Sequence, residues 1–374
     1  IYLCTDNYAR ESNTPRASAG PPIRKADAVV SAEEGHNHTI VSHNRIIDID
    51  QEYLYANHDT HAIGVQGGSS NVFEHNVIDR VGGSGITFYA GPDNGHRPVW
   101  VQPMENNTIR YNFIANVRDT SGTAEGSRRN QRGISTGGSN FSRTHHSRNR
   151  VYYNVLADIT HEALRSMAPK PPETNFSWRF LNNVVYRAGV GIAIVAHSFP
   201  WNAADGLWTG FGHLFANNLL LSSRQSHVSL QGTAQELYHT SNQLRNNLYF
   251  PDTADSFCAP ANRTRRALRA EASACPSADR LDFSEWRRRT GLDESSLAAD
   301  PRLAGEQVAA GFEEAAAFAP RPGSPVLGAG MPVGLHQDFA GRPVTGSPSM
   351  GAFQEAAVAR VVGHRVPLKR DDDE

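Results

Sequence analysis

Short segments centred on one asparagine recur along the chain. They read SHNRI, EHNVI, RYNFI, YYNVL, LNNVV, ANNLL and RNNLY, and most place apolar residues directly after the asparagine. The central residues are Asn44, Asn76, Asn112, Asn154, Asn183, Asn218 and Asn247. Their spacing of 29 to 42 residues fits one coil of a solenoid whose loops vary in length.

The offsets around each asparagine predict an inward side chain. Because residues two apart share a face of a strand, NVFEHNVI puts Asn76 on the same side as Val72 and Ile78. An inward amide at each coil could hydrogen-bond to the next coil and form a ladder. The alternative is that asparagine only marks loops, but loop residues would not keep apolar neighbours at fixed offsets.

A second strand type alternates with the asparagine segments. Its copies are HAIGVQG, GITFYAG, GISTGG, ALRSMAP, GIAIVAH and HVSLQG, which align on an aliphatic column. That column consists of Ile63, Ile86, Ile134, Leu164, Ile192 and Val228. No amphipathic helix separates the strands before residue 262, which argues against alternating βαβ units. The pattern predicts an all-β protein, a right-handed parallel β-helix with loop insertions and a C-terminal capping tail.

The repeats divide the chain into five parts. We expect a segment leading into the helix at 1–36, coils at 37–250, a helical and loop insertion at 251–296, a C-terminal coil and cap at 297–356, and a flexible tail at 357–374. Insertions at about 91–105, 118–132 and 198–212 interrupt the coils. Insertions of this kind gather on one face of a solenoid and often build its binding groove. The Pro/Gly-rich tail is expected to cover the open end.

The amino-acid composition limits the kinds of partner that the protein is expected to bind. The 374 residues are 39% hydrophobic and carry a formal net charge of -2, so no global field favours nucleic acid or a membrane. No run approaches the roughly 20 apolar residues of a spanning helix, and the first residues, IYLCTDNYARES, have no export-signal pattern. We expect a monomer. Cys258 and Cys275 flank one loop and either form a disulfide or remain free, which leaves Cys4 over.

The asparagine ladder, the paired strands and the ending resemble a known group. With SEWRRRTGLDESSLAADPRL, PGSPVLGAG, DFAGRPV and GAFQ, residues 37–354 resemble bacterial right-handed parallel β-helix proteins of the polysaccharide lyase and glycoside hydrolase type. The resemblance implies a secreted or periplasmic protein with a polysaccharide or oligosaccharide substrate. It also raises Ca²⁺ as a cofactor, because uronate-acting β-helices often use it to bridge carboxylates. No compact acidic cluster in the sequence identifies ligands, and no zinc spacing is present.

A narrower resemblance concerns HDTHAIGVQ, residues 58–66. It is similar to the Asp-x-His segment of periplasmic mannuronan C5-epimerases. In that family a second Asp follows the His, where this chain has Ala62. The resemblance therefore implies only His61 as a base and Asp59 as its neighbour.

Ionisable residues share one column of the second strand type. Two positions before the aliphatic column stand His61, Ser84, Arg132, Glu162, Val190 and Ser226. Neighbouring coils lie about 4.8 Å apart, so these residues could face one groove. Further positions of the same strands add Thr87, Ser135, Arg165, Gln66 and Tyr89, and Asp59 and His161 stand just before two of the strands. The alternative for each is a solenoid corner residue that hydrogen-bonds turn carbonyls.

The column suggests β-elimination of a uronic-acid polymer as the leading hypothesis. Arg132 or Arg165 would neutralise the substrate carboxylate, His61 would remove the C5 proton with Asp59 orienting it, and Tyr89 would protonate the leaving oxygen. Substrate contacts are predicted for Arg165, His161, Gln66, Lys170, Trp201 and Trp208. A glycoside hydrolase would instead pair Glu162 with Asp59. The same column would also suit a C5-epimerase or a non-catalytic glycan-binding β-helix.

Overall fold

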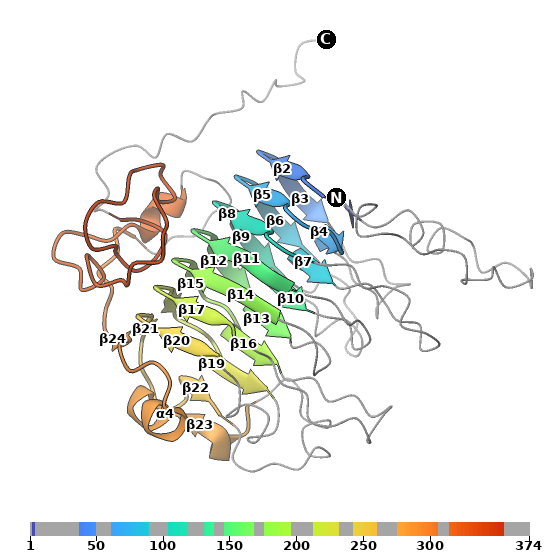
Figure 1. The fold of residues 1–374 in the computed structure, drawn as a ribbon. Helices are drawn as coiled ribbons and strands as arrows, with labels where there is room; N and C mark the ends of the chain where they lie inside the picture. Colours follow the sequence, from blue (N-terminus) through green and yellow to red (C-terminus); the bar gives the residue numbers. More distant parts are fainter. Residues whose placement is uncertain are drawn as a thin grey trace, which may run out of the picture.

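The computed structural model is a right-handed parallel β-helix, as the repeats predict (Figure 1). It describes residues 2–3, 37–49, 61–89, 104–118, 131–137, 146–167, 176–195, 212–231, 242–259, 275–305 and 314–354. Three sheets, here called A, B and C, follow one another in every coil. All strand pairs in them are parallel except β22 with β23.

Each sheet stacks one strand from successive coils. Sheet A contains β1 (Tyr2–Leu3), β4 (His61–Gln66), β7 (Ser84–Tyr89), β10 (Ile134–Gly137), β13 (Glu162–Met167), β16 (Val190–Val195), β19 (Ser226–Gln231), β22 (Phe257–Cys258) and β23 (Arg280–Leu281). Sheet B contains β2 (Ile40–Ser42), β5 (Val72–Glu74), β8 (Thr108–Arg110), β11 (His146–Tyr152), β14 (Phe176–Leu181), β17 (Leu214–Ala216) and β20 (Gln243–Arg245). Sheet C contains β3 (Arg45–Ile49), β6 (Val77–Val81), β9 (Phe113–Val117), β12 (Val155–Ile159), β15 (Val184–Tyr186), β18 (Leu219–Leu221), β21 (Leu248–Phe250) and β24 (Leu297–Ala298).

The predicted aliphatic column forms the core side of sheet A. Ile63 lies opposite Ile86, Ile86 opposite Ile134, and Ile134 opposite Leu164. The column continues through Ile192 and Val228 to Phe257, and every member is completely buried. Because each side chain packs on its copies above and below, neighbouring coils bury one another.

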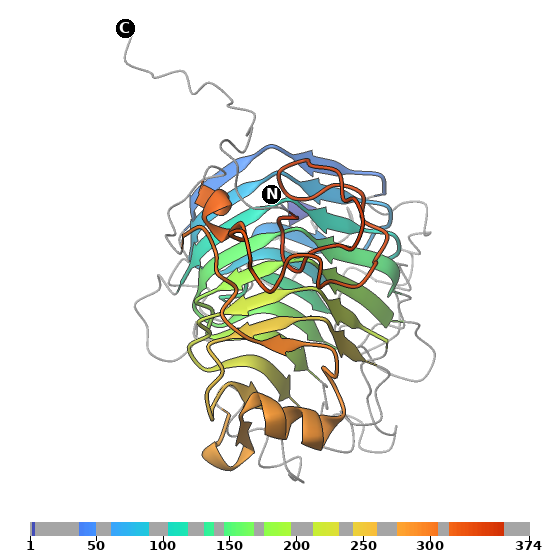
Figure 2. The same ribbon diagram turned by 90° about the vertical axis from the view of Figure 1, so that its left-hand side faces the viewer.

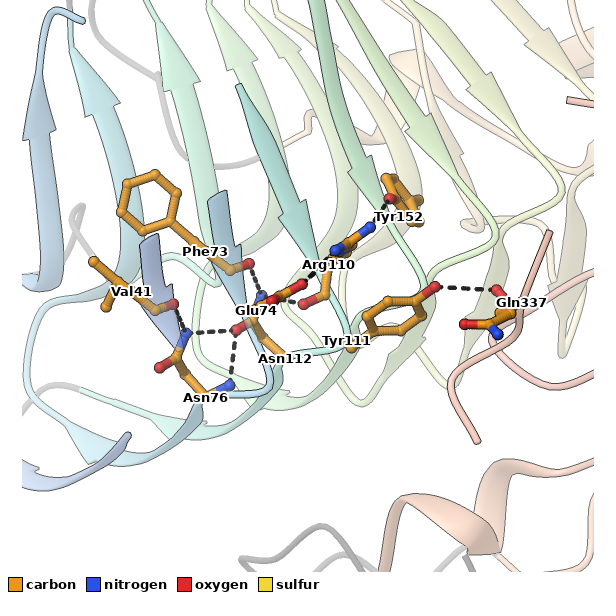
Figure 3. Close-up of polar contacts among 9 residues, drawn as sticks. All are labelled: Val41, Phe73, Glu74, Asn76, Arg110, Tyr111, Asn112, Tyr152 and Gln337. Atoms are coloured by element: carbon orange, nitrogen blue, oxygen red, sulfur yellow. Dashed lines mark hydrogen bonds and ion pairs between the residues drawn. The ribbon is translucent and has the colours of Figure 1, made fainter. Parts of the chain in front are cut away.

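The predicted asparagine ladder runs through the corner between sheets B and C (Figure 3). The backbone N–H of Asn76 donates to Asn112 Oδ1 at 3.0 Å, and the Asn76 side-chain amide donates to the same atom and to the Val41 carbonyl oxygen. The same bonds repeat from Asn44 to Asn247. The ladder therefore satisfies the buried backbone groups of the turn, each bond contributing about 1 kcal/mol.

The prediction that Val72 lies on the same side of its strand as Asn76 is wrong. Val72 is half-buried on the outer side of β5, whereas Phe73 is completely buried and faces the core with Asn76. The cause is His75, which adopts φ 54° immediately before the asparagine. A left-handed residue breaks the two-residue alternation, so the period cannot be counted through the corner.

A second ladder, which the sequence analysis missed, runs parallel to the first. The backbone N–H of Asn71 donates to Asn107 Oδ1 at 3.0 Å, and that of Asn107 donates to Asn149 Oδ1 at 2.9 Å. In later coils His213 and Asn242 continue this line. Each member stands five residues before a member of the first ladder, and this fixed offset is the signal that could have revealed it.

The last coil is closed by a short helix. Helix α4 (Phe283–Thr290) is capped by Asp282, whose side chain accepts a hydrogen bond from Glu285 N, and it places Trp286 on Phe257. The short helix η4 (Ser277–Asp279) precedes it. The disulfide between Cys258 and Cys275 forms, with a Cα–Cα distance of 5.9 Å, which confirms the bonded alternative. Within the described residues, no helix is long and apolar enough to span a membrane.

The C-terminal segment lies along the side of the solenoid (Figure 2). It includes η5 (Glu314–Phe318) and the turns up to Gln354. Apolar residues of this segment pack with outward residues of sheets B and C: Phe113, Ala115, Tyr152, Tyr153, Val155, Ala157, Leu181, Val184, Tyr186, Ala216, Leu219, Leu221 and Leu248. The tail thus covers apolar surface, as expected of a cap, but that surface is the side of the stack, and α4 closes the end.

Candidate functional site

The charged column predicted from the alignment forms on sheet A. His61 at the start of β4 lies opposite Ser84 at the start of β7. Arg132 stands two residues before Ile134, and Glu162 two before Leu164, and these two aliphatic residues are register partners. Backbone bonds from Gly85 N to Arg132 O and from Gly133 N to Glu162 O fix the same order. The column therefore runs His61, Ser84, Arg132, Glu162 across four adjacent strands.

Small residues that follow the members of this column explain why the column lies on the outer face of sheet A. A Cβ placed on Gly85 would lie 2.8 Å from Ile114 Cγ2, and one on Gly133 would lie 2.3 Å from Leu156 Cδ2. These distances show that both glycines face the core side chains of sheet C, where no larger residue fits. The following residues, Ile86 and Ile134, face the core as well. Two successive inward positions leave the preceding residue of each strand on the outer face.

Glu162 lies at the centre of the cluster. Its Oε2 is 3.0 Å from Arg132 Nε and 3.1 Å from Arg165 Nε. Its Oε1 accepts a hydrogen bond from Gln231 Nε2 at 3.1 Å. The side chains of Arg132, Glu162 and Arg165 are 12%, 14% and 13% exposed, respectively. One carboxylate thus aligns two guanidinium groups at the surface of sheet A.

The electrostatics of the cluster keep Glu162 ionised. Burial disfavours the charged carboxylate, but the positive charges of Arg165 and Arg132 outweigh it, and the pKa of Glu162 lies below its ordinary value. Among the described residues of the cluster, two guanidinium groups face one carboxylate, which leaves an excess of positive charge. The arrangement suits binding of an anionic group and does not suit proton donation by Glu162.

His61 is held by a threonine on the next strand. Thr87 Oγ1 lies 3.2 Å from His61 Nδ1, and Thr87 is completely buried whereas His61 is half-buried. This hydrogen bond orients the imidazole on the outer face. Arg132 lies two strands away from His61, which corresponds to about 10 Å between backbones. A single sugar unit that contacts both residues must therefore lie over β7, between the two strands, with both side chains reaching toward it.

The other predicted site residues are only partly described. Asp59, Lys170, Trp201 and Trp208 lie outside the described residues. Gln66 and Tyr89 are register partners on β4 and β7, but their side chains lie outside the described part. His161 is half-buried directly before β13, and its backbone N–H donates to Gln131 O at 3.2 Å.

Gln231 is the site residue that the sequence analysis missed. It ends β19 in the HVSLQG segment, at the position that Gln66 occupies in HAIGVQG. The alignment gave its place on the strand. Its contact with Glu162, 69 residues away in sequence, depends on how the side chains reach across the coils between them.

A buried serine and histidine resemble a catalytic pair but cannot act as one. Ser166 Oγ lies 2.9 Å from His213 Nε2, and the backbone N–H of Trp178 donates to His213 Nδ1 at 3.1 Å. Nδ1 is therefore the acceptor, and the proton of the neutral ring is on Nε2, facing the serine. Burial lowers the pKa of His213 to about 3. A ring that already carries its proton toward Ser166 cannot take one from it.

A metal site is not apparent in the described part of the chain. No group of three or more His, Cys, Asp or Glu residues there could hold an ion, so no step is assigned to Ca²⁺. The fold places the protein among parallel β-helix proteins. Comparison of the chain with protein-family models and with curated proteins finds no match.

Proposed function

We propose that this protein is an extracytoplasmic polysaccharide lyase that cleaves a uronic-acid polymer on the outer face of sheet A. The observation that carries the proposal is the pair of arginines, Arg132 and Arg165, aligned by one ionised glutamate on the same face as His61. An excess positive charge beside an oriented imidazole matches the two requirements of proton abstraction next to a carboxylate.

The reaction begins at the carboxylate of the substrate. Arg132, which lies nearer to His61 along the stack than Arg165 does, stabilises the negative charge that develops on this carboxylate when the neighbouring C5–H bond breaks. His61 accepts the C5 proton. The electron pair of the C5–H bond forms the C4–C5 double bond as the C4–O bond breaks, and the leaving oxygen takes up a proton. The products are one unsaturated sugar end and one new reducing end.

Glycoside hydrolysis is less well supported. That reaction needs a protonated carboxylic acid beside a second carboxylate, whereas the pKa of Glu162 is lowered by its two arginines. Epimerisation shares the first two steps of the lyase mechanism and returns a proton to the opposite face of C5. A binding protein without catalysis would use the arginines and make no product.

The test is a screen of the purified protein against alginate, pectate, glucuronan, hyaluronan and neutral glycans. Ultraviolet absorbance reports the unsaturated product, reducing-end release reports cleavage, and deuterium uptake from solvent at C5 reports epimerisation. We expect absorbance and reducing ends to rise together, and both to be lost in His61→Gln and Arg132→Gln. Arg187→Gln is the matched control, because Arg187 is exposed and ion-paired with Asp158 on sheet C.

Three different results would each replace the lyase by another function. Reducing ends without absorbance, lost in Glu162→Gln, would identify a hydrolase. Deuterium uptake without cleavage would identify an epimerase. Binding without any of the three signals would identify a non-catalytic glycan-binding protein.

A further inference from the structure

Two arginines on the outer face of sheet B lie directly opposite each other. Arg150 on β11 is the register partner of Arg179 on β14, and both are exposed. Parallel strands are about 4.8 Å apart, so the two like charges start from adjacent strands, β11 and β14, which are neighbours in Figure 1. Like charges directly opposite in a sheet are destabilising.

Two neighbouring arginines of the same strands or coils, by contrast, are already ion-paired. Arg110 contacts Glu74 through Nε at 2.6 Å and donates to Tyr152 Oη at 2.9 Å (Figure 3). Arg148, which is 73% exposed, contacts Glu105 at 3.3 Å. Within the described residues, the guanidinium groups of Arg150 and Arg179 make no hydrogen bond or ion pair.

The pair belongs to the same two coils as the site on sheet A. β10 and β11 are successive strands of the coil that follows Arg132, and β13 and β14 are successive strands of the coil that contains Glu162 and Arg165. The two arginines of sheet B therefore stand at the same level of the stack as the cluster, on the next face along the chain.

We infer that Arg150 and Arg179 form a second binding surface for an anionic polysaccharide, one that engages the polymer beyond the sugar units held on sheet A. Two cations on adjacent strands can each pair with one carboxylate of a polyuronate, which carries a carboxylate on every sugar. The choice of a polyuronate rests on the proposed function, whereas the presence of an anion-binding surface does not.

Nucleic acid fits this surface less well than a polyuronate does. Proteins that bind single strands combine basic residues with exposed aromatic side chains for base stacking. On the described outer face of sheet B, Tyr152 is buried at 7% exposure and already bonded to Arg110. The whole chain also has a net charge of -2, so no long-range field draws a nucleic acid to it.

The experiment measures polymer binding by the full chain in a His61→Gln background, which leaves the polymer intact. The test variant is R150Q/R179Q and the matched control is R187Q/R288Q, which removes the same charge from two exposed arginines that are ion-paired with Asp158 and Glu285, respectively. We expect the dissociation constant for polygalacturonate and alginate oligosaccharides to rise severalfold and up to about 25-fold in the test variant, from up to about fivefold for each exposed ion pair, and to change little in the control. The salt dependence of binding should weaken in the test variant.

A second readout distinguishes a binding role from a structural one. Because the two charges repel each other in the absence of ligand, Arg150→Gln should leave the melting temperature unchanged or slightly higher while it weakens binding. An unchanged dissociation constant in R150Q/R179Q would overturn the inference. Equal affinity for a single-stranded oligonucleotide and for the uronate oligosaccharides would also overturn it.

Failure of this inference and failure of the proposed function give different results. Turnover that depends on His61 and Arg132, with KM unchanged in R150Q/R179Q, would support the lyase function and contradict the second binding surface. Uronate binding that depends on Arg150 and Arg179, without turnover by the wild-type protein, would support the second binding surface and contradict the lyase function.

Discussion

The outer faces of sheets A and C are built by the same coils, yet they carry different side chains. On sheet C the residue after each ladder asparagine from Asn76 onward faces outward and is apolar, as Phe113, Val155, Val184 and Leu219 are. On sheet A the corresponding outer column carries His61, Arg132 and Glu162. The C-terminal segment covers the apolar face, and the charged cluster lies on the other.

This difference shows that the outer faces of one solenoid can have different roles. An apolar outer face is stable only when another segment buries it, so it adds a second hydrophobic core. A face that carries ion pairs gains little stability from them and can contact a polar ligand instead. The same repeat thus supports folding on one side and binding on another.

Removing the cover of sheet C should have the largest effect. Truncation after Gly305 would expose the apolar residues of that face, and we expect a protein that unfolds or aggregates. The milder variant Phe318→Ala, which removes a buried ring that packs on Tyr186, should cost about 3–5 kcal/mol. Urea unfolding measures this cost. Truncation after Gln354 is the control, and a stable protein lacking residues 306–374 would contradict the covering role.

Acid should lower the folding stability of the core on which the outer faces of sheets A and C are both built. The pKa of His213 is lowered from 6.5 to about 3 by burial. Since the unfolded chain binds a proton that the folded ring resists, stability is complete above pH 6.5 and is lost as the pH falls toward 3, by on the order of 5 kcal/mol in total.

Buried His227, with a pKa of about 4, should add a smaller loss in the same direction. Urea midpoints measured across this pH range should fall less steeply in His213→Gln than in the wild type. Equal slopes would show that His213 is not held neutral.

Glu162→Gln should affect stability less and activity more. It leaves Arg132 and Arg165 without their shared carboxylate, which we expect to cost about 1–3 kcal/mol, less than for a fully buried pair. Because the folded pKa of Glu162 is lowered, its contribution is present above pH 4.5 and is lost as the pH falls below that value. The stability difference between wild type and variant should therefore shrink in acid.

Activity of the same variant tests its positioning role. We expect kcat to fall and KM to change less, because the two guanidinium groups would lose their alignment. A variant with wild-type kcat and KM would show that Glu162 has a structural role and does not position the arginines for catalysis.

The smallest effect is expected at the exposed ion pairs of sheet C. Arg187→Gln removes the contact with Asp158, and exposed pairs of this kind are worth about 0–1 kcal/mol. Thermal unfolding should show a shift close to the experimental error, with activity unchanged. A loss comparable to that of Phe318→Ala would mean that charges stabilise this face as strongly as the apolar cover does.

Local repetition made the coils predictable. The register of Ile63, Ile86, Ile134 and Leu164 was correct because each coil repeats the same aliphatic position, and that position packs on its own copies. The same alignment placed Arg132 beside Glu162. The ladder from Asn44 to Asn247 followed from one residue type at one place in every coil.

The sequence by itself therefore determined the parallel β-helix, its inner column and its first ladder, because these features are repeated and depend on neighbouring coils. Tertiary structure decided what the repeat does not encode. The left-handed turn at His75 reversed the side of Val72, and the contact of Gln231 with Glu162 spans coils. The tail lies on sheet C because the apolar outer residues there need cover. Such contacts join segments that share no repeat, and only the folded chain brings them together.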